Sequence, residues 1–302
     1  MKNKKKFKKK NRWIYRVVIC IALIYGIIIK NSNLDIQNKI SIASKKSLTS
    51  DMEVHFIDVG QADSILVESA GKYMLIDAGN NEDGEKVKSY LQKEGVKELE
   101  YVIATHPHED HIGGMDDIIN SFQVDTIFMP DVAHTTKTFT DVLNAIADNN
   151  LDITVPKVGE QYTIGNAEFI IIAPNRSEYG DNLNNYSIGI KLVNGKNSFL
   201  MCGDVQEEAE NDILNNGIDI SADVYKVSHH GSGTGTTQEF LQAISPSYAV
   251  IQCGIDNEYG HPHQATLDKF NALNIMVYRT DKNGTIVAVS DGEDIRWTCE
   301  KK

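Results

Sequence analysis

Cysteine and proline are both scarce in this chain of 302 residues, which has four of the first and six of the second. The cysteines show no paired spacing, which excludes a disulfide framework and a cysteine-rich zinc site. They stand at Cys20, Cys202, Cys253 and Cys299. The chain also lacks a G-x-S-x-G elbow and a G-x-x-x-x-G-K motif, so elbow-type serine hydrolases and P-loop nucleotide-triphosphatases are excluded. Few prolines and 41% hydrophobic residues fit a folded globular protein.

Basic residues are fewer than acidic ones in the chain as a whole, and they are concentrated in the first thirty positions. Residues 1–30 contain ten Lys or Arg and no acid, so of the total charge of −12 the remainder carries −22. A body this acidic repels polyanions over its general surface, which argues against avid, non-specific nucleic-acid binding through a basic face. An anionic substrate is therefore expected to be attracted locally, by metal ions.

The first thirty residues have the pattern of a membrane-insertion signal. A basic stretch precedes an apolar segment from Trp13 to Ile29, which only Arg16 interrupts. About 17 residues is the lower limit for a span, and no A-x-A-like cleavage site follows. An uncleaved anchor helix is thus favoured over a cleaved signal peptide, which would give a secreted protein. The preceding positive charge predicts a single-pass protein of the cell membrane with its main domain outside.

The domain organisation follows from this pattern. Residues 1–30 are expected to form the leader and anchor, residues 31–51 a polar linker, and residues 52–302 one folded domain.

From Met52 onward, segments with strand alternation and segments with helical periodicity follow one another. Strands are expected in MEVHFIDVG, ADSILVES, KYMLIDAG, ELEYVIAT, VDTIFMP, AEFIIIAP, YSIGIKLV, NSFLMCG, ADVYKVS, YAVIQCG and TIVAVS. Helices are expected in GEKVKSYLQKEG and near Gly114–Ser121, Lys137–Ala147, Gln206–Asn215, Thr237–Ala243 and His263–Leu273. Two successive sheet-and-helix halves predict an α/β sandwich with helices outside two central sheets.

The strongest chemical signal is THPHEDHIGG, directly after the apolar strand YVIA. It places four possible metal ligands within six positions: His106, His108, Asp110 and His111. Imidazole and carboxylate groups hold zinc, manganese or iron, and a loop at a strand end can aim them at one point. Two of these groups can face one way and two the other, so two adjacent metals are possible. Gly113 and Gly114 predict a close backbone approach where the following helix starts.

Two further strand ends supply compatible groups. Asp204 follows the strand NSFLMCG, and in isolation it is equally typical of a helix N-cap. The strand ADVYKVS ends at the pair His229 and His230, followed by Ser232. A histidine pair at a strand end is an ordinary structural feature more often than a metal site.

Together with FIDVGQADS and LIDAG, these segments resemble the metallo-β-lactamase superfamily. The closer resemblance is to the extracytoplasmic hydrolase domain of ComEC-like competence proteins, over roughly Met52 to Val289. It implies an αββα sandwich that holds two divalent metal ions, Zn or Mn. In the implied ligand set His106 and His108 hold one metal, Asp110, His111 and His229 hold the other, and Asp204 bridges them. Asp77, in LIDAG, is implied to orient ligands.

One ligand of the wider superfamily is missing, because NLNNYS stands where a further histidine is usual. The same Asn-Asn-x-Ser pattern resembles the ComEC-like subgroup. Either Asn184 or Asn185 supplies an amide oxygen, a hard ligand that favours manganese, or the position holds water and the asparagines only form a turn.

The same resemblance assigns roles around the metals. His261, in EYGHPHQAT, is expected to position the substrate or transfer a proton. Asp58, His230 and Ser232 are expected to support the ligands or contact the substrate, with an ordinary loop role as the alternative for Ser232. His134 is expected to be an ordinary loop residue.

The resemblance implies hydrolysis of a phosphodiester outside the membrane, including degradation of a DNA strand, by water activated between two metals. Asp110 or Asp204 is expected to accept the proton of that water. Alternatives are another ester or amide substrate, such as a phosphorylated wall polymer or a β-lactam, and a non-catalytic anchored binding module. The sequence indicates a membrane contact through the N-terminal segment and no obligate protein partner.

Overall fold

The computed structural model describes residues 51–301, so the predicted leader, anchor and nearly all of the linker lie outside the described residues. In that part of the chain, none of the helices combines the length and hydropathy needed to span a bilayer.

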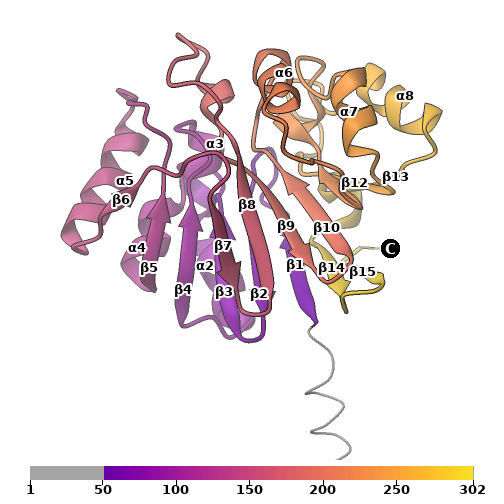
Figure 1. Ribbon diagram of the computed structural model, residues 1–302. Coiled ribbons are helices and arrows are strands. Elements are labelled where there is room, and N and C mark those ends of the chain that lie inside the picture. The colour runs from indigo at the N-terminus through magenta and orange to yellow at the C-terminus, as the bar shows by residue number, and fades with distance from the viewer. Residues whose placement is uncertain (1–50, 302) are drawn as a thin grey trace, which may run out of the picture. The chain divides into compact units, whose positions relative to one another are not determined.

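The described chain forms two β-sheets that pack face to face, with helices on both outer surfaces (Figure 1). The first sheet has eight strands in the order β15-β14-β1-β2-β3-β4-β5-β6. Its strands are β1 (Met52–Phe56), β2 (Ile65–Ser69), β3 (Lys72–Ile76), β4 (Glu98–Ile103), β5 (Gln123–Phe128), β6 (Ile153–Thr154), β14 (Ile286–Ser290) and β15 (Ile295–Cys299). The second sheet has seven strands in the order β13-β12-β11-β10-β9-β8-β7. They are β7 (Gln161–Ile164), β8 (Ala167–Ala173), β9 (Gly189–Asn194), β10 (Asn197–Met201), β11 (Val224–Lys226), β12 (Tyr248–Ile251) and β13 (Met276–Arg279).

Three helices cover each sheet. The first sheet carries α2 (Gly84–Lys93), α4 (Met115–Ser121) and α5 (Lys137–Asp148), and the second carries α6 (Glu207–Asn215), α7 (Gln238–Ile244) and α8 (Gln264–Ala272). Short helices α3 (Glu109–Ile112) and α9 (Thr280–Asn283) lie at strand ends. Two of the long helices begin at threonine caps, because the hydroxyls of Thr136 and Thr237 accept backbone N–H bonds three residues on.

Strand alternation explains the four layers. On β2, Ile65 and Val67 point between the two sheets, while Leu66 points outward beneath the helices. On β3, Met74 faces the other sheet and Leu75 faces the helices. Successive side chains of a strand point to opposite faces, so apolar residues at consecutive positions require cover on both sides. Each fully buried side chain of this size contributes roughly 1.5–3 kcal/mol.

The predicted α/β sandwich is confirmed, and the five helices predicted by residue number begin and end within about two residues of the observed bounds. Four strands were not predicted: β6, β7, β13 and β15. In β7 and β15, polar residues alternate with apolar ones. These two strands add to the sheets by antiparallel pairing with β8 and β14.

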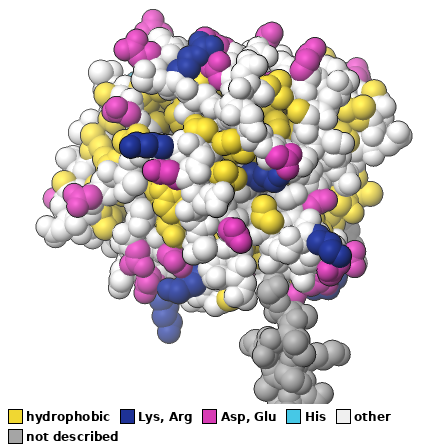
Figure 2. All heavy atoms as spheres, in the orientation of Figure 1, with side chains coloured by type: hydrophobic (Ala, Val, Ile, Leu, Met, Phe, Trp, Pro, Cys, Tyr) yellow, Lys and Arg dark blue, Asp and Glu magenta, His cyan; other side chains and the backbone are white. Residues whose placement is uncertain are grey.

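On the face seen in Figure 2, Lys and Arg side chains are scattered singly among Asp and Glu and form no continuous basic band. This arrangement agrees with the acidic balance of the sequence.

The close backbone approach predicted for the two glycines is confirmed. A Cβ at position 113 would lie 2.2 Å from backbone atoms of both Asn80 and Asn81, and one at position 114 would lie 2.5 Å from the Ala78 carbonyl oxygen. Only glycine lets the α3–α4 junction pack this tightly against the turn after β3.

We expect Gly113→Ala to destabilise the protein by about 1–3 kcal/mol, because the added methyl group must displace the Asn80–Asn81 backbone. Urea unfolding measures this, with exposed Ser89→Ala on α2 as a control. Equal midpoints for Gly113→Ala and the wild type would contradict the packing described here.

Candidate metal centre

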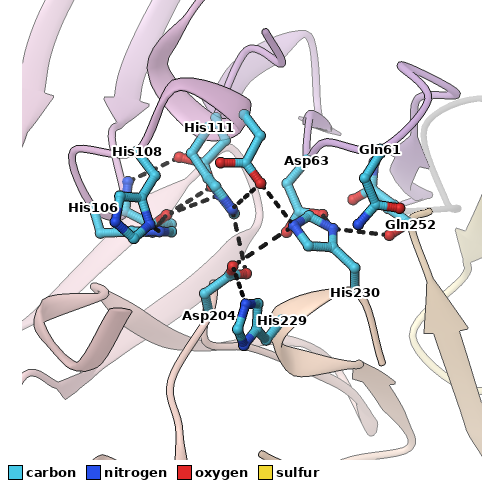
Figure 3. Close-up of polar contacts among 12 residues, drawn as sticks. Gln61, Asp63, His106, His108, His111, Asp204, His229, His230 and Gln252 are labelled. Carbon is cyan, nitrogen blue, oxygen red and sulfur yellow. Dashed lines mark hydrogen bonds and ion pairs between the residues drawn. The ribbon is translucent and has the colours of Figure 1, made fainter. Parts of the chain in front are cut away.

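The predicted ligands meet at one edge of the sandwich, where strands of both sheets end (Figure 3). Asp77 follows β3, and the His106–His111 segment follows β4. Asp204 follows β10, and the histidine pair His229 and His230 follows β11. Because β3 and β4 are parallel, as are β10 and β11, each sheet delivers its polar groups to the same edge.

Four side chains form the centre of this cluster. Ligand atoms of Asp110, His111, Asp204 and His230 all lie within 4.8 Å of one another. The Nε2 atom of His111 is 3.3 Å from Asp204 Oδ1 and 3.7 Å from Asp110 Oδ2. The Nε2 atom of His230 is 3.1 Å from Asp110 Oδ2 and 3.6 Å from Asp204 Oδ2. Two imidazole nitrogens and two carboxylates thus share one small volume.

The orientation of His111 fits a divalent cation. Its Nδ1–H donates to Asp77 Oδ2 at 2.7 Å, which directs the Nε2 lone pair towards Asp204. Both His111 Nε2 and Asp204 Oδ1 are buried and have no hydrogen-bond partner, a costly state for polar atoms that a cation between them would relieve. A carboxylate behind a ligating imidazole is a common support in metal sites. The group therefore has the donor chemistry and geometry of a metal centre.

A second pair of donors lies beside the first group. His106 Nε2 and His108 Nδ1 are 3.0 Å apart, and the His106 ring centroid is 4.1 Å from that of His111. Burial, and then the neighbouring His111, hold the pKa of His106 well below its usual value, so its imidazole is neutral and able to coordinate. His106 and His108 thus form a second donor pair next to the four-residue group.

Charge is balanced inside the cluster by the histidines. Burial alone would raise the pKa of Asp204, but His111 and His230 hold it well below the usual range. Burial would lower the pKa of His230, yet Asp204 and Asp63 raise it to about 10. The carboxylates and imidazoles of the cluster therefore stabilise one another's charged forms.

The two adjacent histidines after β11 are placed differently. His230 is buried, and its Nδ1 lies 3.0 Å from the Gln252 carbonyl oxygen, so its Nε2 faces the four-residue group. His229 is partly exposed, with Nδ1 at 3.0 Å from Thr234 Oγ1 and Nε2 at 3.8 Å from Asp204 Oδ2. His229 thus stays a predicted ligand, while His230, predicted as a supporting residue, lies closer to the carboxylates. Both have left-handed backbones, with φ of 51° and 52°, which cost on the order of 1–3 kcal/mol each.

Asp58 makes its contacts away from the cluster and supports none of the proposed ligands, while its contact with a substrate stays a prediction. Its carboxylate accepts the N–H of Gly60 at 3.3 Å and lies 3.2 Å from Lys301 Nζ. These contacts hold the loop after β1 and connect it to Lys301, and neither contact involves a proposed metal ligand.

The supporting carboxylate from this segment is Asp63, five residues later and not predicted. Its Oδ2 lies 2.6 Å from the buried Lys226 ammonium group, and its Oδ1 lies 3.4 Å from His230 Nδ1. Burial alone would raise the pKa of Asp63, but Lys226 and His230 together hold this pKa below its usual value. The segment FIDVGQADS contains both aspartates, and only the fold shows which one faces inward.

The two asparagines have different surroundings. Asn185 Oδ1 accepts the backbone N–H of Gln206, the N-cap residue of α6, so Asp204 is not that cap. Asn184 Oδ1 is buried without a hydrogen-bond partner. Contact with the ligands comes instead from Ser187, whose Oγ is 3.3 Å from His106 Nδ1 and accepts the backbone N–H of Asp204. Ser187 belongs to the NLNNYS segment, but the sequence alone did not predict its role.

Ser232 acts through a neighbour. Its hydroxyl lies 3.1 Å from Thr234 Oγ1, and Thr234 in turn lies beside His229. The hydroxyl therefore helps to hold the residue that orients His229.

His261 lies at the rim of the cluster. Its ring centroid is 5.6 Å from that of His229, and its Nδ1 is 3.4 Å from Gln61 Nε2. Burial, with smaller effects from His230 and His229, lowers its pKa to about 4. The residue is thus near the predicted ligands without being one of them. His134 lies farther out, with its ring 6.2 Å from that of His108.

We expect Asp77→Asn to weaken metal affinity about 10–100-fold, because the amide cannot anchor the His111 imidazole as the carboxylate does. Titration with zinc and manganese, read by calorimetry, measures the change. Asp58→Asn is the matched control and should bind metal like the wild type. Equal affinities for Asp77→Asn and Asp58→Asn would refute the supporting role of Asp77.

Comparisons with known proteins agree with this fold. The family model of the metallo-beta-lactamase superfamily matches residues 57–255. The chain is 33% identical over 257 residues to ComE operon protein 3 of Bacillus subtilis (strain 168), covering 79% of this chain and 33% of that protein. It is 28% identical over 240 residues to recombination protein 2 of Haemophilus influenzae, covering 78% of this chain and 28% of that protein. The chain thus spans about a third of the length of these relatives.

A solved structure shows the same fold. The metallo-beta-lactamase fold protein YhfI from Bacillus subtilis has a TM-score of 0.54 and 13% identity, with 80% of this chain and all of that chain covered. The predicted resemblance to ComEC-like competence proteins is confirmed by the named relatives. With the matched family model covering about two thirds of its length, the chain belongs to the metallo-beta-lactamase superfamily.

Proposed function

We propose that this protein is a metal-dependent phosphodiesterase that acts on a nucleic-acid or related phosphodiester chain outside the cell membrane. The observation that supports it most is the pair of adjacent donor groups, one around His111 and Asp204 and the other at His106 and His108. Two-ion centres suit displacement at phosphorus, because they stabilise both the attacking and the leaving oxygen.

The proposed ligands are imidazole and carboxylate groups, which bind zinc and manganese. His106 and His108 would hold one ion, and Asp110, His111 and a histidine after β11 the other, with Asp204 between them. Divalent ions held here would lower the pKa of a water molecule and neutralise charge on the scissile phosphate.

The chain's own residues supply the rest of the chemistry. Asp110 is about one third exposed and ionised, since nearby His111 and His230 hold its pKa below the usual range against the effect of burial. It can accept a proton from an attacking water molecule, whereas buried Asp204 is placed to hold ions. His261, at the rim, is placed to contact the leaving group or the substrate.

The acidic body limits how a polyanion reaches this site. No continuous basic band crosses the face in Figure 2, so long-range attraction of nucleic acid by that face is weak. The name of one relative, recombination protein 2 of Haemophilus influenzae, supports a nucleic-acid substrate. A β-lactam is less favoured, because NLNNYS replaces the histidine usual in the superfamily.

The test is turnover by the full-length protein with zinc or manganese, using bis-p-nitrophenyl phosphate, linear single-stranded DNA and nitrocefin. We expect phosphodiester turnover, and we expect Asp110→Ala to reduce it about 100-fold or more. His134→Ala is the control, since that histidine lies outside the donor groups. Bound metal without turnover of any phosphodiester, or turnover of nitrocefin alone, would exclude the proposal.

We also propose that residues 1–30 anchor the protein with its hydrolase domain outside the cell. The basic start followed by an apolar segment supports this orientation. Protease added to intact cells should then degrade the domain in the membrane fraction. A domain that is protected until the cells are lysed would place it on the other side.

A further inference from the structure

One aromatic side chain stands apart from all the others. Among the Phe, Tyr and Trp residues of the described range 51–301, Tyr259 is the only one with most of its surface exposed, at 60%. On the same loop, between β12 and α8, Ile255 is 67% exposed. This one loop therefore offers both an aromatic and an aliphatic side chain to a ligand.

The loop is held in place by its own hydrogen bonds. The Asn257 amide donates to the carbonyls of Gly254 and His261, at 2.9 and 2.6 Å, and accepts the His261 backbone N–H at 2.9 Å. Gln61 Oε1 accepts the N–H of Gly254 at 3.1 Å and so ties the loop to the first sheet's side of the site. Tyr259 is therefore presented on a preorganised loop, which lowers the entropic cost of binding.

The exposed ring lies next to the metal centre. Tyr259 stacks on His261, with ring centroids 5.6 Å apart and planes at 26°. The His261 ring is in turn 5.6 Å from the His229 ring. If the scissile bond of a substrate lies at the ions, the part of the substrate next to that bond can contact Tyr259.

A pocket of about 470 Å³ opens beside this loop and is lined by His261, Arg279, Asp281 and Lys282, among others. Its volume is typical of small-ligand sites, which measure roughly 300–1,000 Å³. The Arg279 guanidinium is already paired with Asp281 through two hydrogen bonds, at 2.9 and 2.6 Å. Lys282 forms no ion pair within residues 51–301, but Asp256 lines the same pocket and offsets its charge.

Because the positive charges of Arg279 and Lys282 are largely offset, charge alone gives weak recognition of a substrate here. Stacking on the Tyr259 ring is the stronger contribution. Every nucleobase has a flat π-face that can stack on an aromatic side chain, whatever the sequence. In a duplex those faces are covered by neighbouring base pairs. An exposed tyrosine beside the metal centre therefore suits an unpaired base.

We propose that Tyr259 is the stacking platform for an unpaired nucleobase of a single-stranded nucleic acid whose adjoining phosphodiester lies at the metal centre. Lys282 faces the next phosphate from the neighbouring pocket. This inference rests on the proposed phosphodiesterase function and names the feature by which the site selects single strands.

The test compares two substrates that differ only in their bases: a thymidine oligonucleotide and an abasic deoxyribose-phosphate oligomer of equal length. The kcat/KM ratio of the first to the second is measured for full-length wild type, Tyr259→Ala and Tyr259→Phe. We expect Tyr259→Ala to lower this ratio about 10-fold, mainly through KM, because the stacking contact is lost. Tyr259→Phe keeps the ring and should keep the ratio.

Ile153→Ala, which removes an exposed apolar side chain from β6, is the control and should not change the ratio. An unchanged ratio in Tyr259→Ala would overturn the proposal, even if kcat/KM falls equally on both oligomers. Faster wild-type turnover of poly(glycerol phosphate) than of the oligonucleotide would also overturn it.

A separate outcome concerns the proposed function itself. If the wild type cleaves no phosphodiester, that function fails, and fluorescence anisotropy of the two labelled oligomers tests the subsite on its own. Tighter binding of the thymidine oligomer that is lost in Tyr259→Ala would support the subsite. Equal binding of both oligomers by wild type and variant would reject it.

Discussion

The crowding of carboxylates and imidazoles at one edge of the sandwich is the constraint on which the rest of the structure depends. Asp110, His111, Asp204 and His230 bring their ligand atoms within 4.8 Å of one another, and three of the four are buried. Burial of charged groups costs several kcal/mol each unless partners compensate it. The surrounding fold must therefore hold these groups together against their own solvation, and a metal ion is the partner that fits their unpaired atoms.

Several devices supply that support. Thr105 donates its backbone N–H and its hydroxyl to Asp77, at 2.8 and 2.7 Å, and so fixes the carboxylate that anchors His111. The buried ion pair of Lys226 and Asp63 lies on the other side, beneath His230. Breaking a buried pair of this kind by removing one partner typically costs about 3–5 kcal/mol. The rigidity needed for metal binding is thus built from residues outside the ligand set.

Much of this arrangement can be predicted from the sequence, because strand ends and ligand-type residues coincide in THPHEDHIGG and at Asp204. The succession of two sheet-and-helix halves also predicts two central sheets with helices outside. The sequence cannot show which of two nearby polar side chains points towards the cluster. Asp58 and Asp63 lie in one segment, but Asp58 pairs with Lys301 from the far end of the chain, whereas Asp63 meets buried Lys226. Likewise, left-handed backbone at both histidines after β11 decides which ring faces the carboxylates, and no periodicity encodes it.

The most direct test of the account is anomalous X-ray scattering from crystals soaked in zinc or manganese. We expect a peak between His111 Nε2 and Asp204 and a second peak beside His106 and His108. The same maps show whether His229 or His230 completes the set of ligands. Saturating metal that gives no peak at these side chains, or peaks only at surface carboxylates, would contradict the identification of this cluster as the metal centre.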